Sequence, residues 1–179
     1  MKIFETERLI VREWENKDYN YLYEYASKDE VTKFLTFETY KSIETAHERI
    51  AFLKQEYAEN KITTDYAIEV KDLNKVVGGI GIVHYSEKNE GEAEIGYVLN
   101  PAHQGYGYMT EALLGMFKYI KQKGIAKRII LRCDTLNTKS ENVMKRAGMS
   151  FEGVLRRAGK NNLHSRHDLA LYSILEEEI

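Results

Sequence analysis

The chain has 179 residues, of which 43% are hydrophobic and 30% are charged. These proportions are typical of a soluble globular protein, and the length predicts one domain, residues 1–179, with a core that needs no disulfides. The 26 basic and 28 acidic residues give a formal net charge of −2, which supplies no general attraction to nucleic acid. No apolar run approaches the roughly 20 residues of a membrane span, so we expect neither nucleic acid nor a membrane as a partner.

The cysteine and histidine residues indicate the cellular compartment and whether a metal site is present. Cys133 is the only cysteine, so it has no internal disulfide partner, and this favours a reducing cytoplasm. His164 and His167 are three residues apart, but no third ligand stands at a suitable spacing. We therefore expect a cytoplasmic protein without a metal centre.

The first half of the chain is predicted to contain a strand, two helices and three more strands. Apolar residues alternate at first, then recur every three or four residues, and alternate again from residue 65. Asn16 or Asp18 can cap the first helix, and Ser42 with Thr45 marks the start of the second. The expected ranges are a strand at 8–14, helices at about 16–27 and 42–59, and an antiparallel meander at 65–71, 75–85 and 91–99.

The second half is predicted to begin with a strongly patterned helix. Its apolar residues from Met109 to Ile120 are spaced by three and four, and Gly124 ends it. A strand at 127–134, a helix at 138–148 and a closing hairpin around the KNNL turn follow. This order predicts a mixed α/β (α+β) fold, in which a largely antiparallel central sheet of about seven strands carries packed helices.

The turn between the 91–99 strand and this helix has the features of an anion site. Pro101, the only proline, has no N–H for a sheet, so strand pairing must stop there and leave backbone groups free. Gly105 and Gly107 allow a tight turn and close approach of a ligand. The helix that follows presents unpaired N–H groups and the positive end of its dipole. Together these features predict a site for a phosphate or pyrophosphate.

A dinucleotide-binding turn is one interpretation of this pattern. Thr110 stands where that fingerprint has its third glycine, whereas Asp134, at the end of the next strand, matches its acidic residue. An antiparallel meander precedes the turn, where the fingerprint normally follows the first strand of a βαβ unit. The sequence therefore keeps a dinucleotide-binding oxidoreductase as an alternative.

A second interpretation is a family resemblance. The stretch EIGYVLNPAHQGYGYMTEAL resembles motif A of the GNAT superfamily of N-acetyltransferases, with Gln104, Gly107 and Met109 at the motif positions. Met109 stands where the family has a small residue. The stretches TERLIVREW and NTKSENVMKRAGMSFEG resemble the RimJ/RimL-like branch, which acetylates the N-termini of ribosomal proteins. The three motifs occur in order and span nearly the whole chain.

The resemblance implies the acyl-CoA N-acyltransferase fold, with acetyl-CoA as cosubstrate. In that fold helices cover both faces of the sheet, and the strands at 91–99 and 127–134 splay apart. The pantetheine arm of the cofactor would pair with backbone groups of Val98, Leu99 and Asn100. The pyrophosphate would bind the N–H groups of Gln104, Gly105, Tyr106, Gly107, Tyr108 and Met109, and Asn137 would contact the cofactor beyond the second strand.

The implied reaction is attack of a neutral amine on a thioester carbonyl. An α-amine with a pKa near ~8 or a lysine near ~10.4 is largely protonated at neutral pH, so a base assists the reaction. Glu94 is the candidate base, through a water, although it is one of several strand glutamates that can simply face solvent. Ser140 is the candidate acid for the leaving thiolate, with the N-cap of a short helix as its alternative role.

The acceptor implied by the branch resemblance is a protein N-terminal α-amine. A small-molecule amine (a polyamine, an amino acid or an antibiotic) and a module that binds coenzyme A without chemistry stay open as alternatives. We expect aromatic residues of the N-terminal helices to line the acceptor pocket, namely Tyr19, Tyr23, Phe34, Phe37 and Tyr40. The sequence does not decide the oligomeric state, and a homodimer is one open option.

Overall fold

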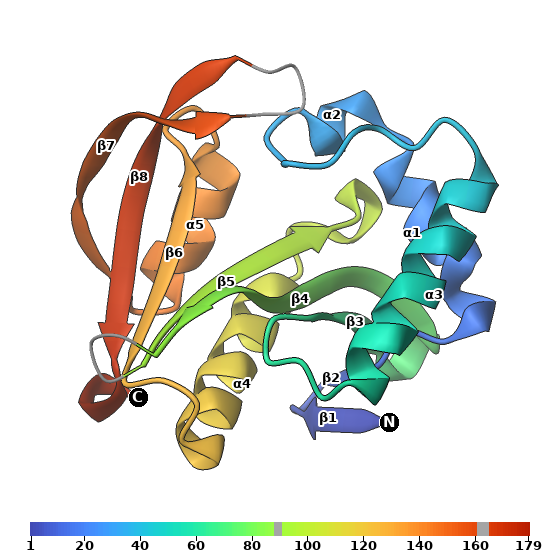
Figure 1. Cartoon of the computed structure of the whole chain (residues 1–179), viewed down its shortest axis with the longest axis horizontal. Helices are drawn as coiled ribbons and strands as arrows, with labels where there is room; N and C mark the ends of the chain where they lie inside the picture. Colours follow the sequence, from blue (N-terminus) through green and yellow to red (C-terminus); the bar gives the residue numbers. More distant parts are fainter. Residues whose placement is uncertain (88–90, 161–164) are drawn as a thin grey trace.

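A computed structural model describes residues 1–87, 91–160 and 165–179 (Figure 1). Its strands are β1 (Lys2–Glu5), β2 (Leu9–Arg12), β3 (Asp65–Val70), β4 (Lys75–Ser86), β5 (Glu92–Leu99), β6 (Arg128–Asp134), β7 (Ser150–Lys160) and β8 (Arg166–Leu175). Its helices are α1 (Tyr19–Ala26), α2 (Asp29–Thr32), α3 (Ile43–Ala58), α4 (Tyr108–Lys123) and α5 (Thr138–Arg146). The tips of the two expected turns, including His164, lie outside the described residues. No described helix combines the length and the apolar character that crossing a bilayer requires.

The strands of the described chain form one eight-stranded sheet in the order β1-β2-β3-β4-β5-β6-β8-β7. All neighbours are antiparallel except β5 and β6, which are parallel. The mixed, largely antiparallel sheet is therefore confirmed. The expected count of about seven omitted β1, because a four-residue edge strand is too short to show a period.

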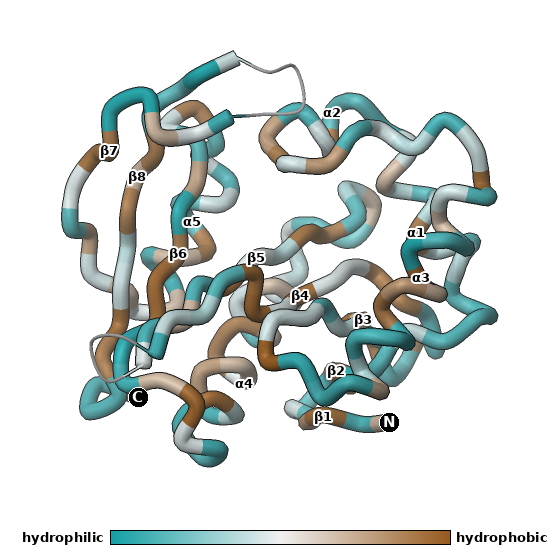
Figure 2. The backbone as a smooth tube through the Cα atoms, in the orientation of Figure 1, coloured by the Kyte–Doolittle hydropathy of each residue, from teal (hydrophilic) through white to brown (hydrophobic). Residues whose placement is uncertain are grey.

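Helices cover both faces of the sheet, as expected. On one face, α4 and α5 pack against a large apolar cluster that includes Leu113, Met116, Phe117 and Met144. On the other face, α1 and α3 pack against a smaller cluster around Trp14. Figure 2 shows the hydrophobic stretches of α4, β6 and β8 that supply the first cluster. The sheet thus separates two apolar layers, each closed by its own pair of helices.

A buried ion pair attaches α1 to the sheet. Asp18, at the start of α1, is fully buried, and its carboxylate accepts hydrogen bonds from Arg12 Nη1 and Nη2 at 2.7 and 3.0 Å. Arg12 Nε also donates to Glu69 on β3 at 2.7 Å. Asp18 was expected to cap the helix with its side chain, but that side chain makes no cap hydrogen bond to α1. Its carboxylate is used instead to neutralise a buried guanidinium, which needs such partners away from water.

The parallel neighbours β5 and β6 separate after a short contact. They pair only from Glu92 to Glu94 on β5, against 128–130 on β6, and β5 then continues to Leu99 paired with β4 alone. Figure 1 shows the two strands meeting at one end and diverging toward the other. The predicted splay is confirmed. Pro101 is not its cause, since it lies in a 3₁₀ turn after β5 and the strands part several residues earlier.

An ion pair across β8 gives the fold a testable pH dependence. Arg128 on β6 donates two hydrogen bonds to Glu152 on β7, each 2.7 Å long, and Ser173 donates a third. The Arg128 and Ser173 hydrogen bonds lower the pKa of Glu152 to about 2. A carboxyl whose pKa falls on folding stabilises the protein above its unfolded pKa, and this stabilisation is lost as the pH falls toward 2.

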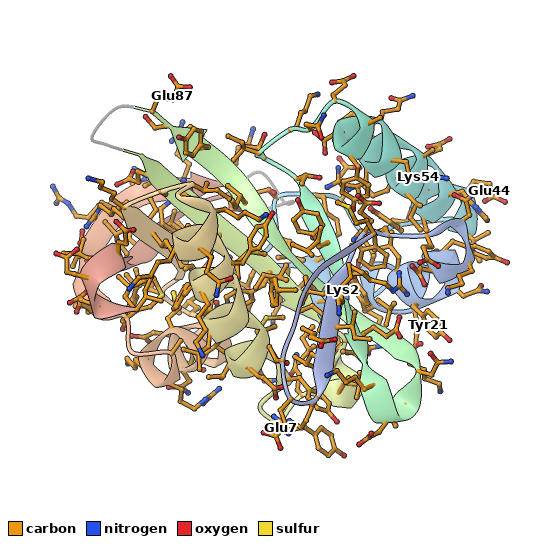
Figure 3. All side chains as sticks on the ribbon, turned by 90° about the horizontal axis from the view of Figure 1, so that it is seen from below. Lys2, Glu7, Tyr21, Glu44, Lys54 and Glu87 are labelled. Atoms are coloured by element: carbon orange, nitrogen blue, oxygen red, sulfur yellow. The ribbon has the colours of Figure 1, made fainter. Side chains whose placement is uncertain are left out.

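We expect Glu152→Gln to lower the free energy of unfolding by about 1–2 kcal/mol at pH 7, a value reduced because both side chains are partly exposed. Urea denaturation at pH 7 and pH 3 measures the difference, which should shrink at pH 3. Glu87→Gln is the control, because Glu87 projects from the periphery in Figure 3 and should have no effect. An equal loss at both pH values would contradict the ion-pair explanation.

Candidate active site

The N-terminus of α4 presents a row of backbone N–H groups without partners. Gly105 and Gly107 adopt left-handed φ angles of 88° and 80°, and Gly107 is the N-cap of α4 without a side-chain cap. Within the described chain, no protein group accepts a hydrogen bond from the N–H groups of residues 105–110. Such donors at the positive end of a helix suit an oxyanion. The structure thus brings the predicted anion-binding residues together.

Met109 does not project into this turn. Its side chain is 4% exposed and packs in the apolar cluster beneath α4. Its backbone N–H still belongs to the unpaired first turn of the helix. The larger residue at this motif position is therefore accommodated by the core.

Arg8 fixes the turn from a distant part of the chain. Its Nη1 donates to the carbonyl oxygen of Tyr106 at 2.9 Å, and its guanidinium lies 4.9 Å from the centre of the Tyr108 ring. Its Nε binds Glu111 at 2.6 Å. Burial favours a raised pKa for Glu111, but hydrogen bonds from Thr6 and Arg8 outweigh it and lower the pKa. Arg8 lies within the TERLIVREW stretch, but its contact with the turn could not be predicted, because Tyr106 is 98 residues further along the chain.

The end of β5 has one edge without a partner strand beside this turn. Val98 and Leu99 lie in the part of β5 that has no β6 partner. Asn100 is used differently, since its N–H donates to Val77 and its carbonyl accepts from His103. Its side-chain amide donates to Glu24 on α1 at 3.0 Å. Asn100 therefore shapes the turn, and its predicted contact with the cofactor stays a prediction.

Ser140 lies on α5 at the opposite side of the splay and contacts Tyr97 of β5. The Tyr97 hydroxyl is 2.9 Å from Ser140 Oγ and also donates to the Ser140 carbonyl oxygen at 3.0 Å. Asn137 is the N-cap of α5, where its side chain accepts from the Ser140 N–H, so the alternative of Ser140 as the cap is wrong. Burial raises the pKa of Tyr97, which keeps its hydroxyl protonated. No sequence pattern singled out Tyr97.

Cys133 lies near Ser140 on β6 but is not poised as a nucleophile. Its side chain is buried, and burial raises the pKa of its thiol to about 11. The thiolate is the reactive form of cysteine, and it is scarce at neutral pH when the pKa is this high.

Glu94 is the last β5 residue that pairs with β6, so it lies at the point where the strands separate. It is 9% exposed, and Arg132 Nε and Nη2 donate to its two carboxylate oxygens at 2.9 and 2.5 Å. The alternative of a strand glutamate that merely faces solvent is therefore wrong. The ion pair keeps the carboxylate in place, and any base function must operate with Arg132 attached.

The aromatic residues expected at the acceptor pocket lie mostly on the α1/α3 side. Tyr19 stacks on His47 with ring centroids 4.0 Å apart, and Phe37 and Tyr40 are 5.6 Å apart. Tyr19, Tyr23, Phe37 and Tyr40 all pack against the Trp14 cluster. Phe34 is not among them. The face of the sheet opposite α4 thus carries the expected aromatic surroundings.

Residues 8–150 match the acetyltransferase (GNAT) domain family. The chain belongs to the GNAT acetyltransferase family. It is 33% identical over 174 residues to the uncharacterized N-acetyltransferase YnaD of Bacillus subtilis (strain 168), covering 97% of this chain and 96% of YnaD. It is also 35% identical over 81 residues to the ribosomal-protein-serine acetyltransferase of Escherichia coli (strain K12), covering 44% of this chain and 45% of that enzyme.

A solved structure of RimL, a ribosomal-protein α-N-acetyltransferase in complex with coenzyme A, has the same fold. Its TM-score is 0.84 over 98% of both chains, with 21% identity. The relatives and the fold identify this GNAT protein as an N-acetyltransferase. The dinucleotide-binding alternative is set aside, since the family match covers the turn that suggested it.

Proposed function

We propose that this GNAT acetyltransferase moves an acetyl group from acetyl-CoA to the α-amine of a protein N-terminus. The observation that carries the proposal is the splay of β5 and β6 beside the uncapped N-terminus of α4. The resemblance to ribosomal-protein acetyltransferases supports the acceptor class. When bound, acetyl-CoA supplies an activated acetyl thioester.

The chain has matching groups for the two ends of this cosubstrate. The edge of β5 at Val98 and Leu99 has no partner strand and can bind an extended amide arm as an added strand, although the Leu99 carbonyl oxygen already accepts a hydrogen bond from Gln104 Nε2 at 3.4 Å. The N–H groups of residues 104–109 can bind its pyrophosphate, although the N–H of Gln104 already donates to Pro101. Asn137 lies at the facing end of α5, where its side chain caps that helix.

The two candidate catalytic residues lie on different elements that border the splay. Glu94, held by Arg132, is proposed to accept a proton from the acceptor amine through a water. Ser140 Oγ is proposed to donate a proton to the departing thiolate. The Tyr97 hydroxyl orients Ser140, because it already contacts both Oγ and the carbonyl oxygen.

A thiol-release assay with a panel of amines tests the proposed function. We expect peptides with a free N-terminal α-amine to be acetylated, whereas the same peptides with a blocked N-terminus release no thiol. A panel that contains amino acids, a polyamine and an aminoglycoside distinguishes the small-molecule alternatives. Thiol release with these compounds but not with peptides would overturn the proposed acceptor class.

A further inference from the structure

We propose that Asp65 is an acceptor subsite that binds a second, positively charged group of the amine acceptor. This inference rests on the acetyl transfer proposed above. The amine that attacks a thioester must be neutral, so a carboxylate that binds charge must hold a different group of the same molecule. The ligand chemistry is thus an ammonium or guanidinium group beside a reacting primary amine.

Asp65 stands in register with the strand that borders the splay. It is the first residue of β3 and pairs with Gly81 on β4, which in turn pairs with Gly96 on β5. Two strand spacings of about 4.8 Å place its backbone about 10 Å from β5. A Cβ at Gly79 would lie 2.9 Å from Asp65 Oδ1, so the carboxylate extends over β4 toward β5.

The carboxylate lies on the face covered by α1 and α3. Successive strand residues alternate between faces, and Ala67, two residues further, packs in the cluster around Trp14. Val98 of β5 packs against the same cluster. Asp65 therefore belongs to the aromatic side of the sheet, where the acceptor is expected.

Asp65 is partly exposed and differs from the other carboxylates on this side of the sheet. Asp18 and Glu69 are tied to Arg12, and Glu94 is tied to Arg132. Within residues 1–87, 91–160 and 165–179, no ion pair includes Asp65 and no side chain donates a hydrogen bond of good geometry to its carboxylate. Asp65 thus offers a negative charge that its own chain leaves unpaired.

The surroundings make this unpaired charge costly. Burial raises the pKa of Asp65 to about 6, although Arg49 and the indole of Trp14 favour its charged form. The neighbouring titratable groups are Arg49, Glu56 and Tyr57 on α3, Tyr25 on α1, Tyr40 before α3, and Tyr66. None neutralises the carboxylate by contact. A ligand cation would supply the missing partner.

A buried polar group beside Asp65 also lacks a partner. Trp14 is 1% exposed, and its Nε1 makes no hydrogen bond. Its N–H favours the charged form of the Asp65 carboxylate, although the two groups form no hydrogen bond of good geometry. The Asp65 carboxylate therefore lacks a cation, and the neighbouring Trp14 N–H lacks an acceptor. Two adjacent polar groups without partners are what an unfilled binding site would show.

Matched acceptors with one and two positive charges test the proposal. The probes are butylamine against putrescine, and peptides that carry norleucine against lysine at the second position. For the doubly charged member of the productive pair, we expect Asp65→Asn to raise KM about tenfold and change kcat less than twofold. KM for the singly charged member should stay within twofold. Glu48→Gln, an exposed charge removal on α3, should change neither.

The two probe pairs distinguish the two possible acceptors. Only the peptide pair should be acetylated if the acceptor is a peptide, and only the butylamine and putrescine pair if it is a diamine. Calorimetric titration with the productive probe, without acetyl-CoA, should show the same loss of affinity in Asp65→Asn. Equal effects on the singly and doubly charged probes would overturn the subsite while leaving acetyl transfer intact. Absence of thiol release with every amine would instead overturn the proposed function, and the subsite with it.

Thermal stability gives an independent readout. The folded pKa of Asp65 lies above its unfolded value, so its charge destabilises the fold fully above about pH 6 and not at all below about pH 4. Asp65→Asn should therefore raise Tm by several degrees at pH 7.5 and leave it unchanged at pH 4. A lower Tm at pH 7.5 would show that Asp65 is a structural residue and would overturn the proposal.

Discussion

Gly107→Ala is expected to weaken acetyl-CoA binding at least tenfold. Gly107 has a φ of 80° as the N-cap of α4, a conformation that costs a residue with a Cβ about 1–2 kcal/mol. Relief of this strain rotates the peptide units that aim the unpaired N–H groups at the ligand. The dissociation constant from calorimetry measures the effect, with a loss of about tenfold for each 1.4 kcal/mol.

Gly124→Ala is the matched control for this substitution. Gly124 closes the other end of α4 with a φ of 60°, and an added Cβ would meet nothing within 4 Å. It should lose about 1 kcal/mol of stability for the same conformational reason, but keep the wild-type affinity for acetyl-CoA. Equal losses of affinity in the two variants would show that strain in α4, and not its N-terminus, controls binding.

Ser140→Ala is expected to lower kcat about 100-fold, which is typical for removal of a positioned acid. The affinity for acetyl-CoA should be unchanged, because the backbone N–H of residue 140 can still donate to the Asn137 side chain that caps α5. Steady-state thiol release gives kcat, and calorimetry gives the affinity. Thr138→Ala, an exposed hydroxyl removal two residues earlier on α5, should leave kcat unchanged.

Tyr97→Phe keeps the Ser140 hydroxyl but removes the Tyr97 hydroxyl that orients it. Because Tyr97 contacts Ser140 Oγ at 2.9 Å, we expect a smaller loss of kcat, about tenfold, in this variant. The double variant should lose little more than Ser140→Ala alone, since the two residues act through one proton donor. Full additivity of the two losses would show that Tyr97 acts independently of Ser140.

Local pattern was sufficient to predict most elements and the anion-binding turn. The apolar spacing of α4, the alternation in β3, β4 and β5, and the Gly105–Gly107 turn are all encoded by neighbouring residues. The splay between β5 and β6 came from the family resemblance and is confirmed by the strand register. Pro101 alone pointed to the end of β5 but not to the place where the strands separate.

Contacts between residues far apart in the chain could not be predicted from the sequence. Arg132 reaches Glu94 across 38 positions of the chain, and Tyr97 reaches Ser140 across 43. Such pairs depend on which strands become neighbours and in what register, and a single sequence records neither. The unpaired state of Asp65 is likewise a property of the whole fold, because it is defined by the contacts that its neighbours do not make.

Calorimetric titration of the wild-type chain with acetyl-CoA tests most directly whether the splay and the α4 N-terminus form the cosubstrate site. We expect saturable binding of one molecule per chain, a higher Tm in the presence of acetyl-CoA, and no heat with NAD. Absence of both heat and a Tm shift with acetyl-CoA would contradict this assignment of the site.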